Sequence, residues 1–138
     1  MDNTFQTDIT FISKVFNEAT TQYDDTEITK TITLKELNRN DRSQHKLHFM
    51  IGSIFDVVPG KGGAPASVEV KSDALYDVSS RAIEILTVID KDGKNGGITE
   101  SEQTEILNDS LALLNFGEWF ASKKALPFFL KSKEKLIK

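Results

Sequence analysis

The chain has 138 residues, of which 38% are hydrophobic and 28% are charged, and its formal net charge is -4. This length suits one domain with a single core, and the composition excludes both a disordered tail and a membrane protein. The absence of cysteine excludes disulfides and thiolate metal sites, and the acidic balance argues against a nucleic-acid partner.

No segment is typical of export or of insertion into a membrane. Residues 1–10 lack a basic stretch followed by an apolar run. No apolar stretch approaches the roughly 18 residues that mark a membrane-spanning helix. We therefore expect a cytoplasmic protein, in the cytoplasm of the host cell if the protein is viral, without a membrane partner.

In the N-terminal half, apolar residues first recur at steps of three and four: Phe5, Ile9, Ile12, Phe16 and Ala19. This spacing predicts an amphipathic helix within residues 1–24, peripheral to the rest of the domain. Within residues 28–34, every second residue is a threonine and the others are mostly apolar, which predicts a short strand. A capping box at 33–36 then predicts a helix that continues to Val58 and ends at Pro59. Residues 67–71 predict a second short strand, which we pair with the first.

The C-terminal half carries helical stripes. One stripe runs from Leu75 to Ile89, and a second begins after Thr99 and reaches Phe116. Further on, Pro127 should kink or restart the last helix. The sequence as a whole predicts a mainly α fold, a single helical domain over 1–138 with one or two short β-strands in its N-terminal half.

The residues do not suggest an enzyme. The two histidines, His45 and His48, lie three positions apart on a predicted helix, with Asp41 one turn upstream. A zinc site needs a further protein ligand and a supporting shell of hydrogen bonds, so exposed or half-buried helix histidines are the favoured interpretation. The carboxylates are scattered and do not pair for acid–base catalysis. We expect no catalytic residues and, apart from calcium, no cofactor.

One segment, residues 90–102, resembles the calcium loop of the EF-hand family. If Lys94 is treated as an inserted residue, the other positions match that loop, and the resemblance implies these metal ligands: Asp90, Asp92, Asn95, Gly97 and Glu102. The same segment also fits an ordinary turn, because Thr99 to Glu102 is itself a capping box. Two interpretations remain open, a calcium-responsive protein-binding module and a structural turn.

A longer segment starting at Ile28 reads ITKTITLKELNRNDRSQHKL. It resembles the start of the tail assembly chaperones of long-tailed bacteriophages, the family of the lambda G protein. The matching residues are Thr31, Ile32, Thr33, Leu34, Glu36, Leu37, Arg42 and His45. These chaperones are small, acidic, mainly helical proteins in which a strand leads into a Thr-Leu-Ser-Glu-Leu motif.

The resemblance implies that the chain binds the tape measure protein, keeps it soluble and assembles along it as a homo-oligomer until the tail tube protein replaces it. A longer form made by ribosomal frameshifting would recruit the tube subunit. Apolar stripes on short helices suit a helical client, and an acidic shell keeps such a complex in solution.

The C-terminal segment is the predicted partner-binding surface. It concentrates five large apolar side chains around Pro127: Trp119, Phe120, Phe128, Phe129 and Leu130. Consecutive residues spread around a helix axis, so one helix cannot turn them all to its own core. Aromatic anchors with a charged rim are typical of binding hot spots. The competing interpretation is that residues 128–130 fill the core of the domain itself.

Overall fold

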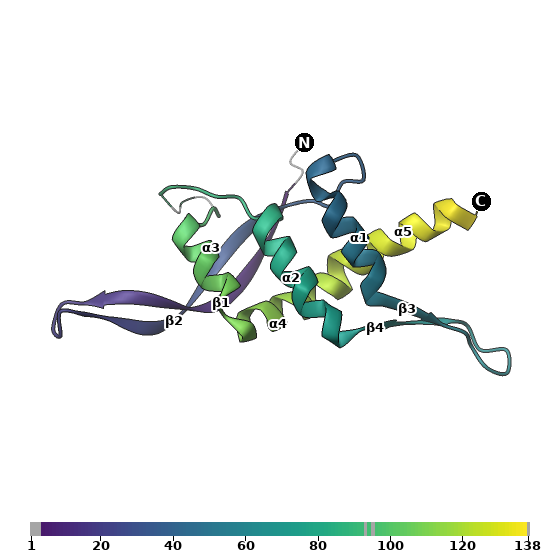
Figure 1. Cartoon of the computed structure of the whole chain (residues 1–138), viewed down its shortest axis with the longest axis horizontal. Coiled ribbons are helices and arrows are strands. Elements are labelled where there is room, and N and C mark those ends of the chain that lie inside the picture. Colours follow the sequence, from purple (N-terminus) through teal and green to yellow (C-terminus); the bar gives the residue numbers. More distant parts are fainter. Residues whose placement is uncertain (1–3, 93, 95, 138) are drawn as a thin grey trace. The chain divides into compact units, whose positions relative to one another are not determined.

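The computed structural model describes residues 4–92, 94 and 96–137, with side chains up to residue 131. Figure 1 labels the strands and α-helices, which are β1 (Thr4–Asn17), β2 (Gln22–Lys35), α1 (His45–Ile54), β3 (Phe55–Val58), β4 (Ser67–Val70), α2 (Ser72–Leu86), α3 (Glu100–Leu107), α4 (Ser110–Phe120) and α5 (Leu126–Ile137). A 3-10 turn (Arg42–Gln44) precedes α1, and a π-helical turn (Ala121–Ala125) joins α4 to α5. Among the described residues, two antiparallel two-stranded sheets accompany the helices. The prediction of a mainly α fold is therefore wrong, and the fold is mixed α/β.

The chain divides into two compact units. Unit 1 comprises Met1–Glu36 and Ile83–Leu113, and unit 2 comprises Leu37–Ala82 and Leu114–Lys138. Each unit is therefore built from two separate stretches of sequence. The prediction of one domain over residues 1–138 stays a prediction.

Strands β1 and β2 form an antiparallel hairpin in unit 1 with 14 residues in each strand. The predicted helix within residues 1–24 is wrong. Two of the residues that suggested it, Phe5 and Ile9, lie with Phe11 on one side of the pleat, and all three are buried. Ile12 and Phe16 point to the other side and are exposed. The threonines of both strands are β-branched and favour extended backbone, so pairing with β2 decides the outcome.

The core of unit 1 lies against one face of this hairpin, and helix α3 packs on β1. Its fully buried large side chains are Phe11, Ile32, Leu34, Ile83, Leu86, Ile98, Ile106 and Leu113. Burial of each such side chain contributes roughly 1.5–3 kcal/mol. The strand predicted over residues 28–34 is confirmed as part of β2.

The helix start predicted at 33–36 is wrong, because β2 continues to Lys35. The Thr33 amide donates to the Gly96 carbonyl at 2.7 Å, and the Thr33 carbonyl accepts from the Val88 amide at 2.9 Å. Both backbone groups of Thr33 are thus used at the outer edge of β2, and neither begins a helix.

Unit 2 contains a second, shorter hairpin, β3–β4, which follows helix α1 directly. The helix predicted as far as Val58 is wrong at that end, since α1 stops at Ile54 and residues 55–58 are strand β3. The strand predicted at 67–71 is confirmed as β4, but it pairs with β3 and not with β2. The turn between them takes Gly62 and Gly63 into positive φ, which glycine adopts without a steric penalty.

The C-terminal helical segment changes its winding before Pro127. Helix α4 passes through the π-helical turn and continues as α5, with Pro127 at the second position of α5. Proline lacks an amide and its ring clashes with the carbonyl four residues earlier, so a wider turn at this point accommodates it. The predicted irregularity at Pro127 is confirmed. Within the described ranges, no helix has the length and hydropathy that crossing a bilayer requires.

The close packing of α2 and α4 in unit 2 gives a prediction. A Cβ added at Gly117 would overlap the Ser79 hydroxyl, which is buried and donates to the Leu75 carbonyl at 2.7 Å. We expect Gly117→Ala to destabilise the protein by about 1–3 kcal/mol through overpacking. Gly52→Ala is the matched control, because a Cβ there meets nothing within 4 Å, and it should stabilise by about 0.5–1 kcal/mol.

Urea denaturation of the two variants measures both effects. If Gly117→Ala were as stable as Gly52→Ala, the two helices would not approach each other at Ser79.

Candidate functional site

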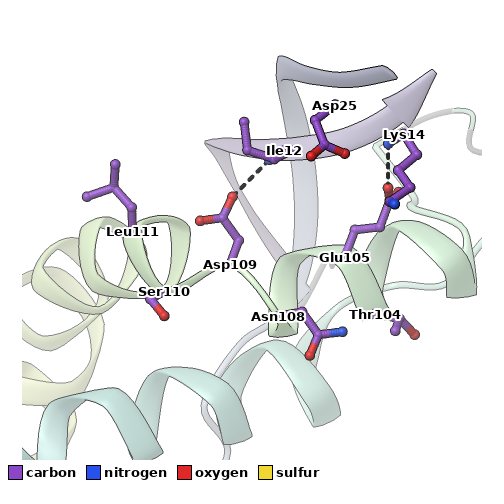
Figure 2. A pocket seen from close by; sticks show the side chains of 9 residues that line it. All are labelled: Ile12, Lys14, Asp25, Thr104, Glu105, Asn108, Asp109, Ser110 and Leu111. Carbon is purple, nitrogen blue, oxygen red and sulfur yellow. Dashed lines mark hydrogen bonds between the residues drawn. The ribbon is translucent and has the colours of Figure 1, made fainter. Parts of the chain in front are cut away.

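Unit 1 contains a groove of about 500 Å³ between the β1–β2 hairpin and the segment from α3 to the first turn of α4. Figure 2 shows the side chains that line it. They are Ile12, Lys14, Asp25, Thr104, Glu105, Asn108, Asp109, Ser110 and Leu111. None of these residues was predicted as a site residue from the sequence.

Two carboxylates close the β1 side of the groove. The Ile12 amide donates to Asp109 Oδ2 at 2.8 Å, and the Lys14 amide donates to Glu105 Oε2 at 2.8 Å (Figure 2). The Ser13 hydroxyl donates to the other Glu105 oxygen at 2.9 Å. The carboxylates thus take the place of a neighbouring strand and satisfy outward-facing amides at this edge of the sheet.

Asp109 also holds helix α4. Its Oδ1 atom accepts from the Ala112 amide at 3.1 Å, and its carbonyl accepts from the Leu113 amide. This is the geometry of an N-cap, and an aspartate is among the residues preferred there. An aspartate just ahead of a serine and a run of apolar residues is a signal that the sequence offered. It also explains why the single helix predicted up to Phe116 is two helices, α3 and α4.

The groove combines acidic and apolar surface. Ile12 is 42% exposed and Leu111 is 65% exposed, and the acidic side chains are Asp25, Glu105 and Asp109. Lys14 supplies one positive charge and lies opposite Asp25 in the hairpin register. Such a lining suits a chain that carries apolar and basic side chains.

The segment predicted as a calcium loop lies in unit 1 and is stabilised by its own hydrogen bonds. The carboxylate of Asp90 accepts from the amides of Asp92 at 3.0 Å and Lys94 at 3.2 Å. A Cβ at Gly97 would collide with the Asp90 side chain, so glycine is needed there for packing. Asn95 lies outside the described residues.

Glu102, the predicted calcium anchor, lies in a different set of contacts. The reciprocal capping box with Thr99 is present, and both carboxylate oxygens accept from the Lys30 ammonium, at 2.8 and 3.1 Å. Burial alone would raise the pKa of Glu102, but the hydrogen bonds from Lys30 and Thr99 outweigh it and hold the pKa below its usual value of 4.5. Calcium would have to displace this ammonium to use the carboxylate.

The predicted partner-binding residues in unit 2 divide between core and surface. Phe120 and Phe129 are buried, and the Phe129 ring lies 5.0 Å from the ring of Phe55 on β3. Phe128 is half-buried, 4.7 Å from the His48 ring. Trp119 is also half-buried, whereas Leu130 is 43% exposed. Two of the five residues thus belong to the core of unit 2.

The β3–β4 hairpin has an apolar face that the sequence did not reveal, because residues 55–58 were predicted as helix. Its register pairs Phe55 with Val70 and Val57 with Val68, which places all four on one face. Phe55 is buried, but Val57 is 53% exposed and Val70 is 44% exposed. The apolar face thus begins in the core of unit 2 and continues into solvent.

The two histidines share a helix turn but not a metal site. Their ring centroids lie 5.9 Å apart, and His48 Nε2 lies 3.0 Å from the side-chain oxygen of Gln44. Burial lowers the pKa of His48, and the positive charge of His45 lowers it further. Among the side chains described, those of residues 4–92, 94 and 96–131, no three of histidine, aspartate or glutamate gather as a metal site would require.

No protein-family model, no curated protein and no solved structure matches this chain.

The depressed pKa of Glu102 predicts a pH dependence of stability. A carboxyl whose folded-state pKa lies below its unfolded value stabilises the fold fully above the unfolded value, 4.5, and this contribution is lost as pH falls through the folded value. Glu102→Gln keeps a capping side chain but loses the charge. We expect chemical denaturation to show a shallower loss of stability in this variant as pH falls below 4.5.

Glu100→Gln, an exposed change in the same helical turn, is the control and should keep the wild-type slope. Equal flattening in both variants would mean that overall charge, and not the Lys30 contact, sets the slope.

A second prediction concerns calcium. We expect millimolar calcium and chelator to leave the thermal unfolding midpoint unchanged, because the Lys30 ammonium and the Thr99 amide already bind Glu102. A ligand at a hundredfold excess over its dissociation constant would stabilise the fold by about 2.7 kcal/mol. A calcium-dependent rise that Glu102→Gln abolishes would contradict this prediction and favour the EF-hand interpretation.

Proposed function

We propose that this chain is a tail assembly chaperone of a long-tailed bacteriophage, which binds the tape measure protein and keeps it soluble during tail assembly. In this role it has no catalytic residues, and its partners are the tape measure protein, the tail tube protein and further copies of itself. It acts in the cytoplasm of the infected host cell.

The resemblance from Ile28 onward supports the proposal. The segment resembles a family in which a strand leads into a Thr-Leu-x-Glu-Leu motif, and here β2 ends at Lys35, inside that motif. Arg42 and His45, the last matching residues, lie on the turn that opens α1.

The single observation that carries the proposal is the amount of apolar side chain that unit 2 leaves in solvent. Besides the two valines of the β3–β4 face, these residues are at least two-fifths exposed: Phe49 at 81%, Tyr76 at 41%, Leu114 at 44% and Leu130 at 43%. Scattered apolar residues are normal on a protein surface, but a continuous apolar hairpin face marks an interaction site. A long helical client offers a matching apolar stripe.

Binding of this kind needs no chemistry beyond burial of apolar surface. An aggregation-prone helix that covers Val57 and Val70 also buries its own apolar stripe. The binding free energy gains roughly 25 cal/mol for each Å² of apolar area removed from water. The charges of this hairpin lie off the apolar face, since Asp56 pairs with Glu69 on the opposite face and the Lys71 ammonium lies 3.3 Å from the Asp56 carboxylate. They help to keep a complex in solution.

The test is co-expression of this chain with the tape measure protein of the same phage. We expect wild-type protein to keep the client in the soluble fraction and to co-purify with it. Val57→Lys/Val70→Lys should weaken binding at least about tenfold, or roughly 1.4 kcal/mol, because it places charge on the apolar face.

The matched control is Ser67→Lys/Glu69→Lys, which adds lysines to the opposite face of the same hairpin and should leave binding unchanged. If the wild-type chain failed to keep the client soluble, the proposed function would be wrong. If both double variants behaved alike, the function would stand but the binding face would lie elsewhere.

A further inference from the structure

The two units carry opposite charge. Unit 1 contains 14 acidic and 5 basic side chains, a formal charge of -9, whereas unit 2 contains 7 acidic and 12 basic, a formal charge of +5. Together they give the -4 of the whole chain. The modest net charge of the chain therefore hides a strong separation of charge between its two units. Unit 1 of one molecule attracts unit 2 of another molecule electrostatically.

The negative charge of unit 1 includes the lining of its groove. Asp25, Glu105 and Asp109 surround the opening with only Lys14 as a counter-charge, and Glu105 and Asp109 are held in place by the amides of β1. Fixed carboxylates cost little reorganisation when a cation arrives, and Leu111 beside them offers apolar area.

The positive charge of unit 2 is concentrated toward the C-terminus. Residues 114–138 contain six lysines and two glutamates. On α5, exposed Leu130 is followed directly by exposed Lys131. Lys123, in the π-helical turn before α5, is also exposed. An apolar side chain next to a basic one is the pattern that complements the groove.

We propose that the groove of unit 1 binds the basic C-terminal segment of a second copy of this chain, with Leu130 against the apolar wall at Leu111 and Lys131 among the carboxylates. The two surfaces of this contact are different, so it is heterologous. It leaves one groove and one C-terminal segment free at the ends and adds further copies in a head-to-tail series.

This contact is separate from the client-binding face on β3–β4, so it is tested on the purified full-length chain without a client. We expect sedimentation velocity at low salt to show self-association that increases with protein concentration and weakens with added salt, because the contact is largely electrostatic. A chain that remains monomeric at all concentrations at low salt overturns the proposal, and a groove filled by its own C-terminal segment would give that result.

Leu111→Lys places a positive charge in the groove and should weaken self-association at least about tenfold. Phe16→Lys is the matched control, the same replacement of an exposed apolar residue of unit 1 outside the groove, and should associate as wild type does. Circular dichroism checks that each variant is folded, and Asp25→Lys replaces Leu111→Lys if the latter is not. Wild-type association of the groove variant, or equal loss in the control, overturns the proposal.

Mixing distinguishes this contact from a symmetric one. The segment variant Leu130→Ala/Lys131→Ala and the groove variant Leu111→Lys should each be monomeric alone. In a mixture, the intact segment of one fits the intact groove of the other, so the expected product is a one-to-one dimer that grows no further. A mixture that stays monomeric, or one that forms a series as wild type does, contradicts the head-to-tail contact.

Discussion

Unit 1 depends on a stripe of carboxylates that fastens α3 and the residues just after it to the hairpin. Glu102 and Glu105 lie three positions apart on one side of α3, and Asp109 follows the end of that helix as the N-cap of α4. Their partners are the Lys30 ammonium on β2 and the amides of two β1 residues. Each hydrogen bond contributes about 0.5–1.5 kcal/mol. Apolar burial supplies more energy, but these contacts fix where the helix sits on the hairpin.

The same stripe shows what the sequence can and cannot predict. The capping box at Thr99 was predictable because its two partners are three residues apart. The contact between Glu102 and Lys30 spans 72 positions, and no pattern of neighbouring residues predicts it. The carboxylate was therefore predicted as a calcium anchor, whereas its observed partner is a lysine. Asp109 lies between the two cases, because its role as a cap is local and its bond to β1 is not.

The long hairpin was missed for a related reason. Phe5, Ile9, Ile12 and Phe16 satisfy a helical period, and only pairing with residues 22–35 reveals that Ile12 and Phe16 lie on the other face. β1 has 14 residues and, within the described part of the chain, pairs only with β2, the next strand in the sequence. The sequence therefore lacks the series of several strands that would have indicated a larger sheet. In the β3–β4 hairpin only β3 and its pairing were missed, because Phe55, Val57 and Val58 directly follow the apolar residues of a helix and such a short segment fits either structure.

The two hairpins differ in how they are protected, and this difference bears on function. On the exposed face of β1–β2, polar side chains pair across the strands, with Thr10 bonded to Thr29 at 2.7 Å and Thr31 bonded to Asp8 at 2.6 Å. Carboxylates also occupy part of its β1 edge, as in proteins that avoid edge-to-edge aggregation. The β3–β4 hairpin has no such ladder on its apolar face, where valine lies opposite valine. The contrast is one of degree, because the exposed face of β1–β2 also carries an aromatic pair, Phe16 and Tyr23, whose ring centroids lie 5.3 Å apart. On β3–β4 the exposed valines lie on one face without polar pairs among them, and an apolar face of this kind is typical of an interaction site.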